Sequence, residues 1–331
     1  MLILWIVIFI ISLIALVKGS DWLISSAEKI GLALGFSPFI VGVTIVSIGT
    51  SFPELISSLA ATFKGVTEVV AANAIGSNIA NILLIVGISA VIGRRLVVTK
   101  SLIDLDLPLL AIATVLFLGV VWDKKITFGE SLLMLATYMV YLLYTAFHKD
   151  TEDTDEIYEV LPSRRERREH IAVQKKETLV RPKLSSKDFI MLILGIIGLF
   201  FGAKYLIEAL VKLSEILNVA TGVITITAVA FGTSLPELLV SAKAAFQKKS
   251  EISLGNIFGS NIFNAFVVIG FPGLFSLLSV DNQTFAIGVP TMAFATFLFI
   301  ISGISRRIHI WEGLFYLSIY ILFIAKLFNW F

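Results

Sequence analysis

The sequence predicts an all-α polytopic membrane protein whose ten transmembrane helices form two five-helix repeats of inverted topology. Three observations support this fold class: the composition, ten apolar runs, and a motif that occurs twice. Of 331 residues, 57% are hydrophobic and 15% are charged, with a mean hydropathy of +0.94. Soluble domains are typically about 45–50% apolar and about 25% charged. A membrane-spanning helix needs about 20 residues to cross about 30 Å of hydrocarbon.

Five apolar runs lie before residue 148. The first covers residues 2–17 and is not preceded by the basic segment of a secretory signal, so we expect a span whose amino end faces out. The other four runs cover about 36–63, 69–92, 102–121 and 127–147. Together they predict a first half at residues 1–148.

Residues 149–187 have a different composition. Six acids lie within 150–159 and eight Lys or Arg within 164–183. The segment predicts a solvated cytoplasmic loop, either a plain charged linker or one with a regulatory or lipid-binding role.

The second half, residues 188–331, holds five further apolar runs. They cover about 188–211, 219–246, 252–279, 284–304 and 309–329. The positive-inside rule places most basic residues of the connections in the cytoplasm and both termini outside. The cytoplasmic set is Arg94, Arg95, Lys100, Lys248, Lys249, Arg306 and Arg307, with Lys64, Lys124 and Lys125 outside. Because five is an odd number, the second half enters the membrane from the opposite side, as in the inverted repeats of secondary transporters.

A Gly-Thr-Ser-x-Pro-Glu motif occurs at 49–54 and again at 232–237, which is 183 residues further on (237 − 54). A carboxylate at the centre of a bilayer costs about 2.5–3.5 kcal/mol. The proline frees the carbonyl four residues earlier, that of Gly49 or Gly232. Carboxylate, hydroxyl and carbonyl oxygens are the hard ligands that Na⁺ and Ca²⁺ prefer. The alternative is a proline-kinked helix whose Glu is neutral or paired with a basic residue.

A second repeated pattern has the same offset. Asn73, Ser77 and Asn81 correspond to Asn256, Ser260 and Asn264. Residues four apart share one helix face, so each apolar span carries a single polar stripe. Such a stripe either holds helices together or lines a ligand site. Its recurrence beside the Glu motif favours the ligand site.

With Gly-Ser-Asn-x-x-Asn at 76–81 and 259–264 beside the Glu motifs, the chain resembles the cation/calcium antiporter superfamily, in particular the prokaryotic sodium/calcium exchangers. The resemblance implies a secondary active antiporter, not an enzyme, that exchanges Ca²⁺ for Na⁺ by alternating access at a midplane site between the repeats. It implies Ca²⁺ and Na⁺ as transported ions, no organic cofactor, and location in a prokaryotic cell (inner) membrane. It also implies that helices one and six, about 2–30 and 188–214, slide past the ion-binding core.

The resemblance further assigns ion ligands. Ca²⁺ would bind the carboxylates of Glu54 and Glu237 and the carbonyl oxygens of Thr50 and Thr233. Na⁺ would bind Ser51, Ser77, Ser234, Ser260, the side chains of Thr50 and Thr233, and the carbonyl oxygens of Ser47 and Ala230. Asn81 and Asn264 would line the centre.

One position departs from many exchangers of this type, which carry Asp where this chain has Asn264. The site therefore holds two carboxylates, which balance one Ca²⁺ or two Na⁺. Three Na⁺ would leave one net positive charge, so the stoichiometry stays open.

Two alternative functions remain. A proton/calcium exchanger would use the Glu pair to shuttle protons, but protons need no shell of hydroxyl ligands. A cation channel would usually gather its filter from several subunits or loops. The absence of Cys, and three His residues that all lie near the ends of apolar runs, exclude thiolate chemistry and an H-E-x-x-H site. The basic residues lie in connecting segments, so nucleic acid is not an expected partner.

Overall fold

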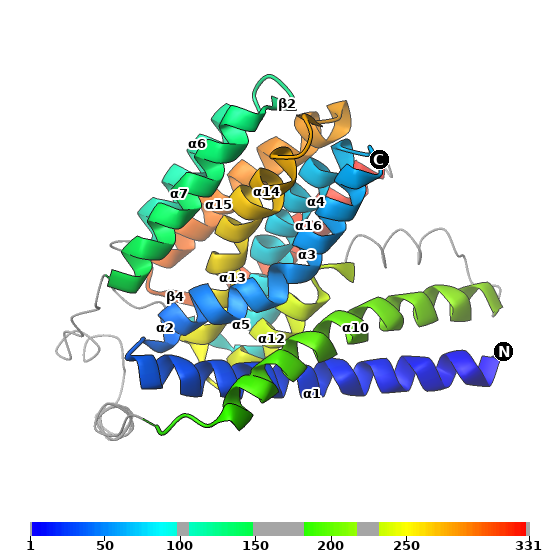
Figure 1. Cartoon of the computed structure of the whole chain (residues 1–331), viewed down its shortest axis with the longest axis vertical. Helices are drawn as coiled ribbons and strands as arrows, with labels where there is room; N and C mark the ends of the chain where they lie inside the picture. The colour runs from blue at the N-terminus through cyan, green and yellow to red at the C-terminus, as the bar shows by residue number, and fades with distance from the viewer. Residues whose placement is uncertain (1, 98–105, 148–181, 217–231, 329–331) are drawn as a thin grey trace.

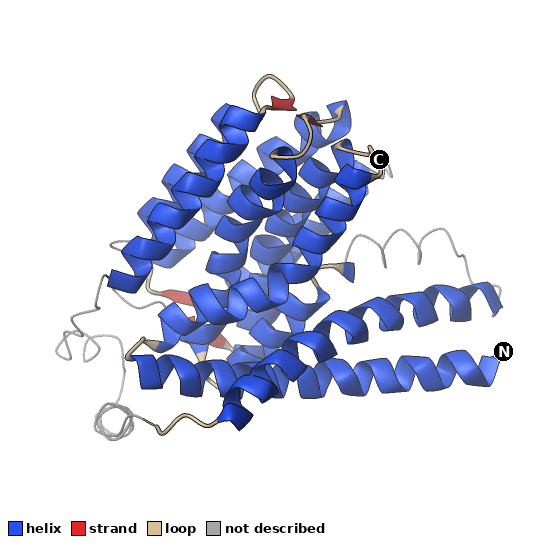
Figure 2. Ribbon diagram, viewed as in Figure 1, coloured by secondary structure: helices blue, strands red, loops and turns tan. Residues whose placement is uncertain are grey.

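The computed structural model describes residues 2–97, 106–147, 182–216 and 232–328 (Figure 1). Nearly all of this part is helical, and only short strands connect some of the helices (Figure 2). The prediction of an all-α membrane protein is confirmed.

The first half contains five helical segments, some of which change type along their length. They are α1 (Leu2–Leu34); α2 (Pro38–Val41), η1 (Gly42–Val46) and α3 (Ser47–Phe63); α4 (Glu68–Ile79), η2 (Ala80–Val86) and α5 (Gly87–Gly93); α6 (Leu107–Val120); and α7 (Phe128–Phe147). The elements η1 and η2 are π-helical turns that widen otherwise continuous helices.

The second half follows the same order. Its helices are α10 (Ser186–Ile216); α12 (Leu235–Phe246); α13 (Ser250–Phe263), η4 (Asn264–Val268) and α14 (Ile269–Gly273); η5 (Thr284–Gly288) and α15 (Val289–Ile304); and α16 (Ile310–Leu327). Within the described residues, eight helices are long and apolar enough to cross a membrane. The shorter α6 and α12 lie where two further spans are predicted, and the count of ten stays a prediction.

Two predicted boundaries are wrong. The apolar run that predicts the first span ends at residue 17, and the first helix is expected to end at about residue 30. The helix α1 instead continues to Leu34. Its charged residues are tolerated because they find partners: Asp21 pairs with Lys243 at 2.6 Å and Glu28 pairs with Lys249. The span predicted over 252–279 ends earlier, at Gly273, because the chain then leaves the helix and forms a short strand.

Two short strand pairs show how the halves are related. The strand β1 (Arg95–Val97) pairs with β4 (Arg307–His309), and β2 (Lys125–Ile126) pairs with β3 (Leu278–Ser279). In the first ladder, Arg95 lies opposite His309. The counterparts of these residues in the other half are Leu278 (95 + 183) and Ile126 (309 − 183), and they lie opposite each other in the second ladder. Each ladder therefore joins both halves in the same register. Figure 1 places β2 and β4 at opposite ends of the bundle, as expected for inverted repeats.

The helices α1 and α10 form a long pair that crosses the other helices at a steep angle (Figure 1). Their backbones approach closely, since a Cβ atom on Gly19 would lie 2.9 Å from the carbonyl oxygen of Gly195. At about 1.5 Å per residue, α1 is about 50 Å long, more than the hydrocarbon thickness requires. Lys29, near its carboxyl end, pairs with Asp188 at the start of α10 at 2.7 Å.

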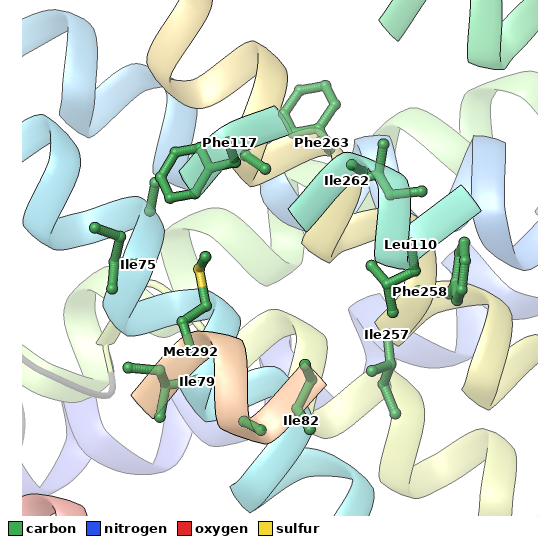
Figure 3. Close-up of a cluster of buried hydrophobic side chains, with 14 of the residues drawn as sticks. Ile75, Ile79, Ile82, Leu110, Phe117, Ile257, Phe258, Ile262, Phe263 and Met292 are labelled. Carbon is green, nitrogen blue, oxygen red and sulfur yellow. The ribbon is translucent and has the colours of Figure 1, made fainter. Parts of the chain in front are cut away.

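The apolar faces of α4 and α13 form the centre of the main core (Figure 3). Ile75 and Ile79 come from α4, Ile257 from α13, and they pack in one cluster with Phe117 of α6 and Met292 of α15. The polar stripes of α4 and α13 therefore lie on faces that this core does not cover, and these faces meet α3 and α12.

Candidate cation site

The site lies where helices of one half meet helices of the other. The helix α3 packs against α13, and α12 packs against η2 and α5. The contact of α13 with α2 and η1 is close, because a Cβ atom on Gly255 would lie 2.5 Å from the carbonyl oxygen of Phe39 in α2 and 3.1 Å from Cα of Gly42 in η1. Each Glu-bearing helix thus faces the Asn-bearing helix of the opposite half.

The two predicted carboxylates are fully buried at this contact. Glu54 is 0% exposed and Glu237 is 1% exposed. Ser51, one turn before Glu54, donates a hydrogen bond to Oε1 of Glu237 at 2.8 Å. The structure therefore brings the two copies of the motif into one site.

The two prolines act differently. Pro53 lies inside α3, which continues through it. In the second copy, by contrast, α12 begins at Leu235 with Pro236 in its first turn. The residues just before Leu235 form a turn, so backbone groups there are released from regular helical hydrogen bonding.

Several buried polar atoms at the centre have no hydrogen-bond partner among the described residues. These atoms are Glu54 Oε1 and Oε2, Glu237 Oε2, and the amide oxygens and nitrogens of Asn81 and Asn264. Asn81 and Asn264 are both 0% exposed. Buried polar groups are normally satisfied, and each exception needs an explanation such as an ion. A cation between the carboxylates would satisfy the oxygen atoms of this set.

The predicted serine ligands pair across the boundary between the halves. Because Ser51 gives its one proton to Glu237, it accepts from Oγ of Ser260 at 2.9 Å, and Ser234 donates to Oγ of Ser77 at 3.3 Å. Ser47 is 0% exposed and hydrogen-bonds back to the carbonyl oxygen of Val43. Thr50 and Thr233 also lie in the described part, whereas Ala230 lies outside the described residues.

Two features of the site are not predicted by the sequence reasoning. The π-helical turns η2 and η4 begin at Ala80 and Asn264, so both central Asn residues lie in a widened turn. Such turns occur frequently at functional sites. No signal in the sequence predicts them, because a single apolar stretch reads the same in an α-helix and in a π-helical turn.

The second feature is the division of the polar stripe. Its outer members, Asn73 and Asn256, are hydrogen-bonded to side chains of neighbouring helices, and they serve as helix contacts. Its inner members, Asn81 and Asn264, are buried, and their amide atoms have no hydrogen-bond partner among the described residues. The repeated Asn-Ser-Asn spacing could have predicted the outer contacts, but it does not separate the two roles.

The arrangement fits a dehydrated hard cation. Two carboxylates, two amide oxygens and several hydroxyls match the oxygen set of Ca²⁺ and Na⁺. The ion pairs of the described residues do not include Glu54 or Glu237, which disfavours a structural pair with Lys or Arg. No group of three His, Cys, Asp or Glu forms within the described part of the chain, so the acidic charge of the site comes from these two Glu residues.

Inverted halves with buried acids at their interface define the class of secondary transporters. A family model described as sodium/calcium exchanger protein matches residues 4–147 and 187–329. The chain belongs to this family.

Individual relatives agree with this assignment. The sodium/calcium exchanger MaX1 of Methanosarcina acetivorans is 33% identical, with 97% of each chain covered. The inner membrane protein YrbG of Escherichia coli is 28% identical, covering 88% of this chain and 86% of that protein. A solved structure of the sodium-calcium exchanger NCX_Mj matches with a TM-score of 0.80 and 28% identity, covering 99% of this chain and 100% of that chain.

Proposed function

We propose that the protein is a secondary active antiporter that exchanges Ca²⁺ for Na⁺ by alternating access, with the ions bound near the midplane between the repeats. The observation that carries the proposal is the set of orphaned oxygens on Glu54, Glu237, Asn81 and Asn264, which both halves contribute. The names of the relatives MaX1 and NCX_Mj support Na⁺ and Ca²⁺ as the exchanged ions.

Antiport follows from the charge of the site. Two ionised carboxylates in a low dielectric repel each other strongly unless a cation neutralises them. The empty site therefore resists closing, whereas a site that holds one Ca²⁺ or two Na⁺ is neutral and can close. Because only a loaded site crosses between the two sides, exchange results rather than leak.

The long pair α1 and α10 is our candidate for the moving element. It packs in a core cluster separate from the main one, in which Leu16 and Leu23 of α1 and Leu199 of α10 meet buried residues of α2, η1, α12 and α13. Glycines at the α1–α10 contact, such as Gly19 and Gly195, bring the two backbones close together, so the pair can move as one body. The ion pairs of Asp21 and Glu28 attach this body to α12 and to Lys249, which precedes α13.

We further propose that both termini face outside and that residues 149–187 are a cytoplasmic loop. The ladder of β1 and β4 carries Arg95 and Arg307, while the ladder of β2 and β3 carries Lys125. Gln283 donates to the carbonyl oxygen of Leu327, so the carboxyl end lies near the second ladder. The proposed orientation places the ladder of β1 and β4, with its two Arg residues, on the cytoplasmic side and the ladder of β2 and β3, with one Lys, outside. The carboxyl end then lies on the outer side, as proposed.

Flux measurements on the purified protein test the proposal. Proteoliposomes loaded with Na⁺ and diluted into Na⁺-free buffer with ⁴⁵Ca²⁺ should accumulate Ca²⁺. The uptake should persist when an uncoupler removes the pH gradient and should stop when Na⁺ is equal on both sides. Uptake that needs no Na⁺ but stops with the uncoupler would instead establish a proton/calcium exchanger. Fast flux that is independent of any counter-ion would establish a channel.

A further inference from the structure

We propose that Asn256 and Asn73 are positioning residues of the cation site. Each accepts the hydroxyl proton of the threonine in the opposite half's Gly-Thr-Ser motif, so that the threonine oxygen presents its lone pairs to Na⁺. The inference rests on the proposed function, because it explains how the same site prepares its Na⁺ ligands.

Two contacts at corresponding positions carry the inference, a hydrogen bond in one case and a longer contact in the other. Thr50 Oγ1 donates to Asn256 Oδ1 at 3.0 Å, and Thr233 Oγ1 donates to Asn73 Oδ1 at 3.4 Å. The offset of 183 converts Thr50 into Thr233 and Asn73 into Asn256. The contact therefore occurs twice, each time across the boundary between the halves.

The orientation of the Asn73 amide is fixed by its other partners. Its Nδ2 atom donates to the backbone carbonyl oxygen of Glu54 at 3.3 Å and to Oγ of Ser58 at 3.1 Å. A carbonyl oxygen can only accept, so the amide nitrogen must face Glu54 and the amide oxygen must face Thr233. Thr233 is then the donor of its bond with Asn73.

The Asn256 amide has the equivalent surroundings. It is 0% exposed, and its Nδ2 atom donates to Oγ of Ser241 at 2.8 Å. Ser241 is the counterpart of Ser58, since 58 + 183 = 241. A serine hydroxyl can donate or accept, so the orientation of Asn256 is assigned by its correspondence with Asn73, with the amide oxygen toward Thr50.

The position of the hydroxyl proton matters for ion binding. A hydroxyl carries one proton and two lone pairs, and a cation binds only the lone pairs. In addition to Asn256, Thr50 Oγ1 can donate to the carboxylate of Glu237 or, at 3.3 Å, to the carbonyl oxygen of Ser47. That carbonyl is itself an expected Na⁺ ligand. By taking the proton, Asn256 leaves both the Thr50 hydroxyl oxygen and the Ser47 carbonyl oxygen free for Na⁺.

A double-mutant cycle tests the assignment. Asn256→Ala, Thr50→Val and the double variant are reconstituted, and the Na⁺ and Ca²⁺ concentrations for half-maximal exchange are measured. Thr50→Val removes the hydroxyl and keeps the backbone carbonyl that is proposed to bind Ca²⁺. Asn256→Ala should raise the Na⁺ concentration for half-maximal exchange about tenfold, because that is the effect of losing about one hydrogen bond. The Ca²⁺ concentration should change less than about twofold, and the double variant should be no worse than Thr50→Val alone.

Asn261→Ala is the matched control on the same helix. Among the described residues its amide nitrogen donates to the carbonyl oxygen of Ile257 one turn earlier and to no threonine, so the Na⁺ concentration for half-maximal exchange should stay near that of the wild type. Asn73→Ala with Thr233→Val repeats the cycle in the other half.

Three outcomes would overturn the inference while leaving the exchanger function intact. The first is that the effects of the two single substitutions on the Na⁺ concentration for half-maximal exchange add up in both cycles. The second is that the Asn variants raise the half-maximal Na⁺ and Ca²⁺ concentrations by the same factor. The third is that Asn73→Ala and Asn256→Ala both unfold when Asn261→Ala folds. A wild-type protein without Na⁺-coupled flux would overturn the proposed function, and the inference with it.

Discussion

Replacing Glu54 or Glu237 by Gln is expected to abolish Na⁺-driven Ca²⁺ uptake while the protein stays folded. Both carboxylates are buried, and among the described residues neither is paired with Lys or Arg. Removing one partner of a buried charge pair costs about 3–5 kcal/mol. Such a loss lowers Ca²⁺ affinity by at least about 100-fold, which reduces uptake in the ⁴⁵Ca²⁺ assay to background.

Thermal unfolding in detergent separates this effect from misfolding. Without Ca²⁺, each Gln variant should be at least as stable as the wild type, because Gln has nearly the shape of Glu and one repelling buried charge is removed. With Ca²⁺ at about 100 times its dissociation constant, the wild type should gain about 2.7 kcal/mol of stability, and the variants should gain almost nothing. A variant that transports Ca²⁺ normally would show that this Glu is not a ligand.

Gly259→Ala is expected to be the most damaging change of a residue outside the predicted ligands. A Cβ atom at this position would lie 2.3 Å from the carbonyl oxygen of Val43 and 2.4 Å from Oγ of Ser47. Because backbone cannot move aside cheaply, α13 must shift away from η1. Overpacking of this kind costs about 1–3 kcal/mol. The shift would also displace Ser260 and Asn264, so we expect transport to be lost together with thermal stability.

Gly129→Ala is a suitable control for this prediction. Gly129 lies in the first turn of α7, and a Cβ atom there would meet no described atom within 4 Å. This variant should keep transport and should gain up to about 1 kcal/mol of stability, since Ala is a better helix residue than Gly. Equal melting temperatures and equal uptake for the two variants would contradict the close packing of α13 on η1.

Much of the architecture is predictable from the sequence because the chain repeats itself. The offset that relates Glu54 to Glu237 also relates the two Asn-bearing stripes, and long apolar runs predict spanning helices without knowledge of tertiary contacts. The structure agrees, as Ser51 of the first half hydrogen-bonds to Glu237 of the second. Inversion likewise follows from the odd number of predicted spans.

Other features depend on contacts that no local pattern encodes. The length of α1 is set by partners such as Lys249, which is more than two hundred residues from Glu28 in the sequence. The strand pair of β1 and β4 involves only three residues on each side, too few for a recognisable alternation. The roles of Asn73 and Asn81 separate only when the neighbouring helices are in place.

The central claim is that Glu54 and Glu237 together hold one divalent cation between the halves. Anomalous diffraction from crystals of the protein soaked in Sr²⁺, a heavier analogue of Ca²⁺, tests it most directly. We predict one strong peak between the two carboxylates, at about the 2.3–2.6 Å typical of Ca²⁺–oxygen contacts or slightly further, which disappears when Na⁺ is in excess. A strong peak elsewhere, or a peak that touches one Glu only and is indifferent to Na⁺, would contradict the account.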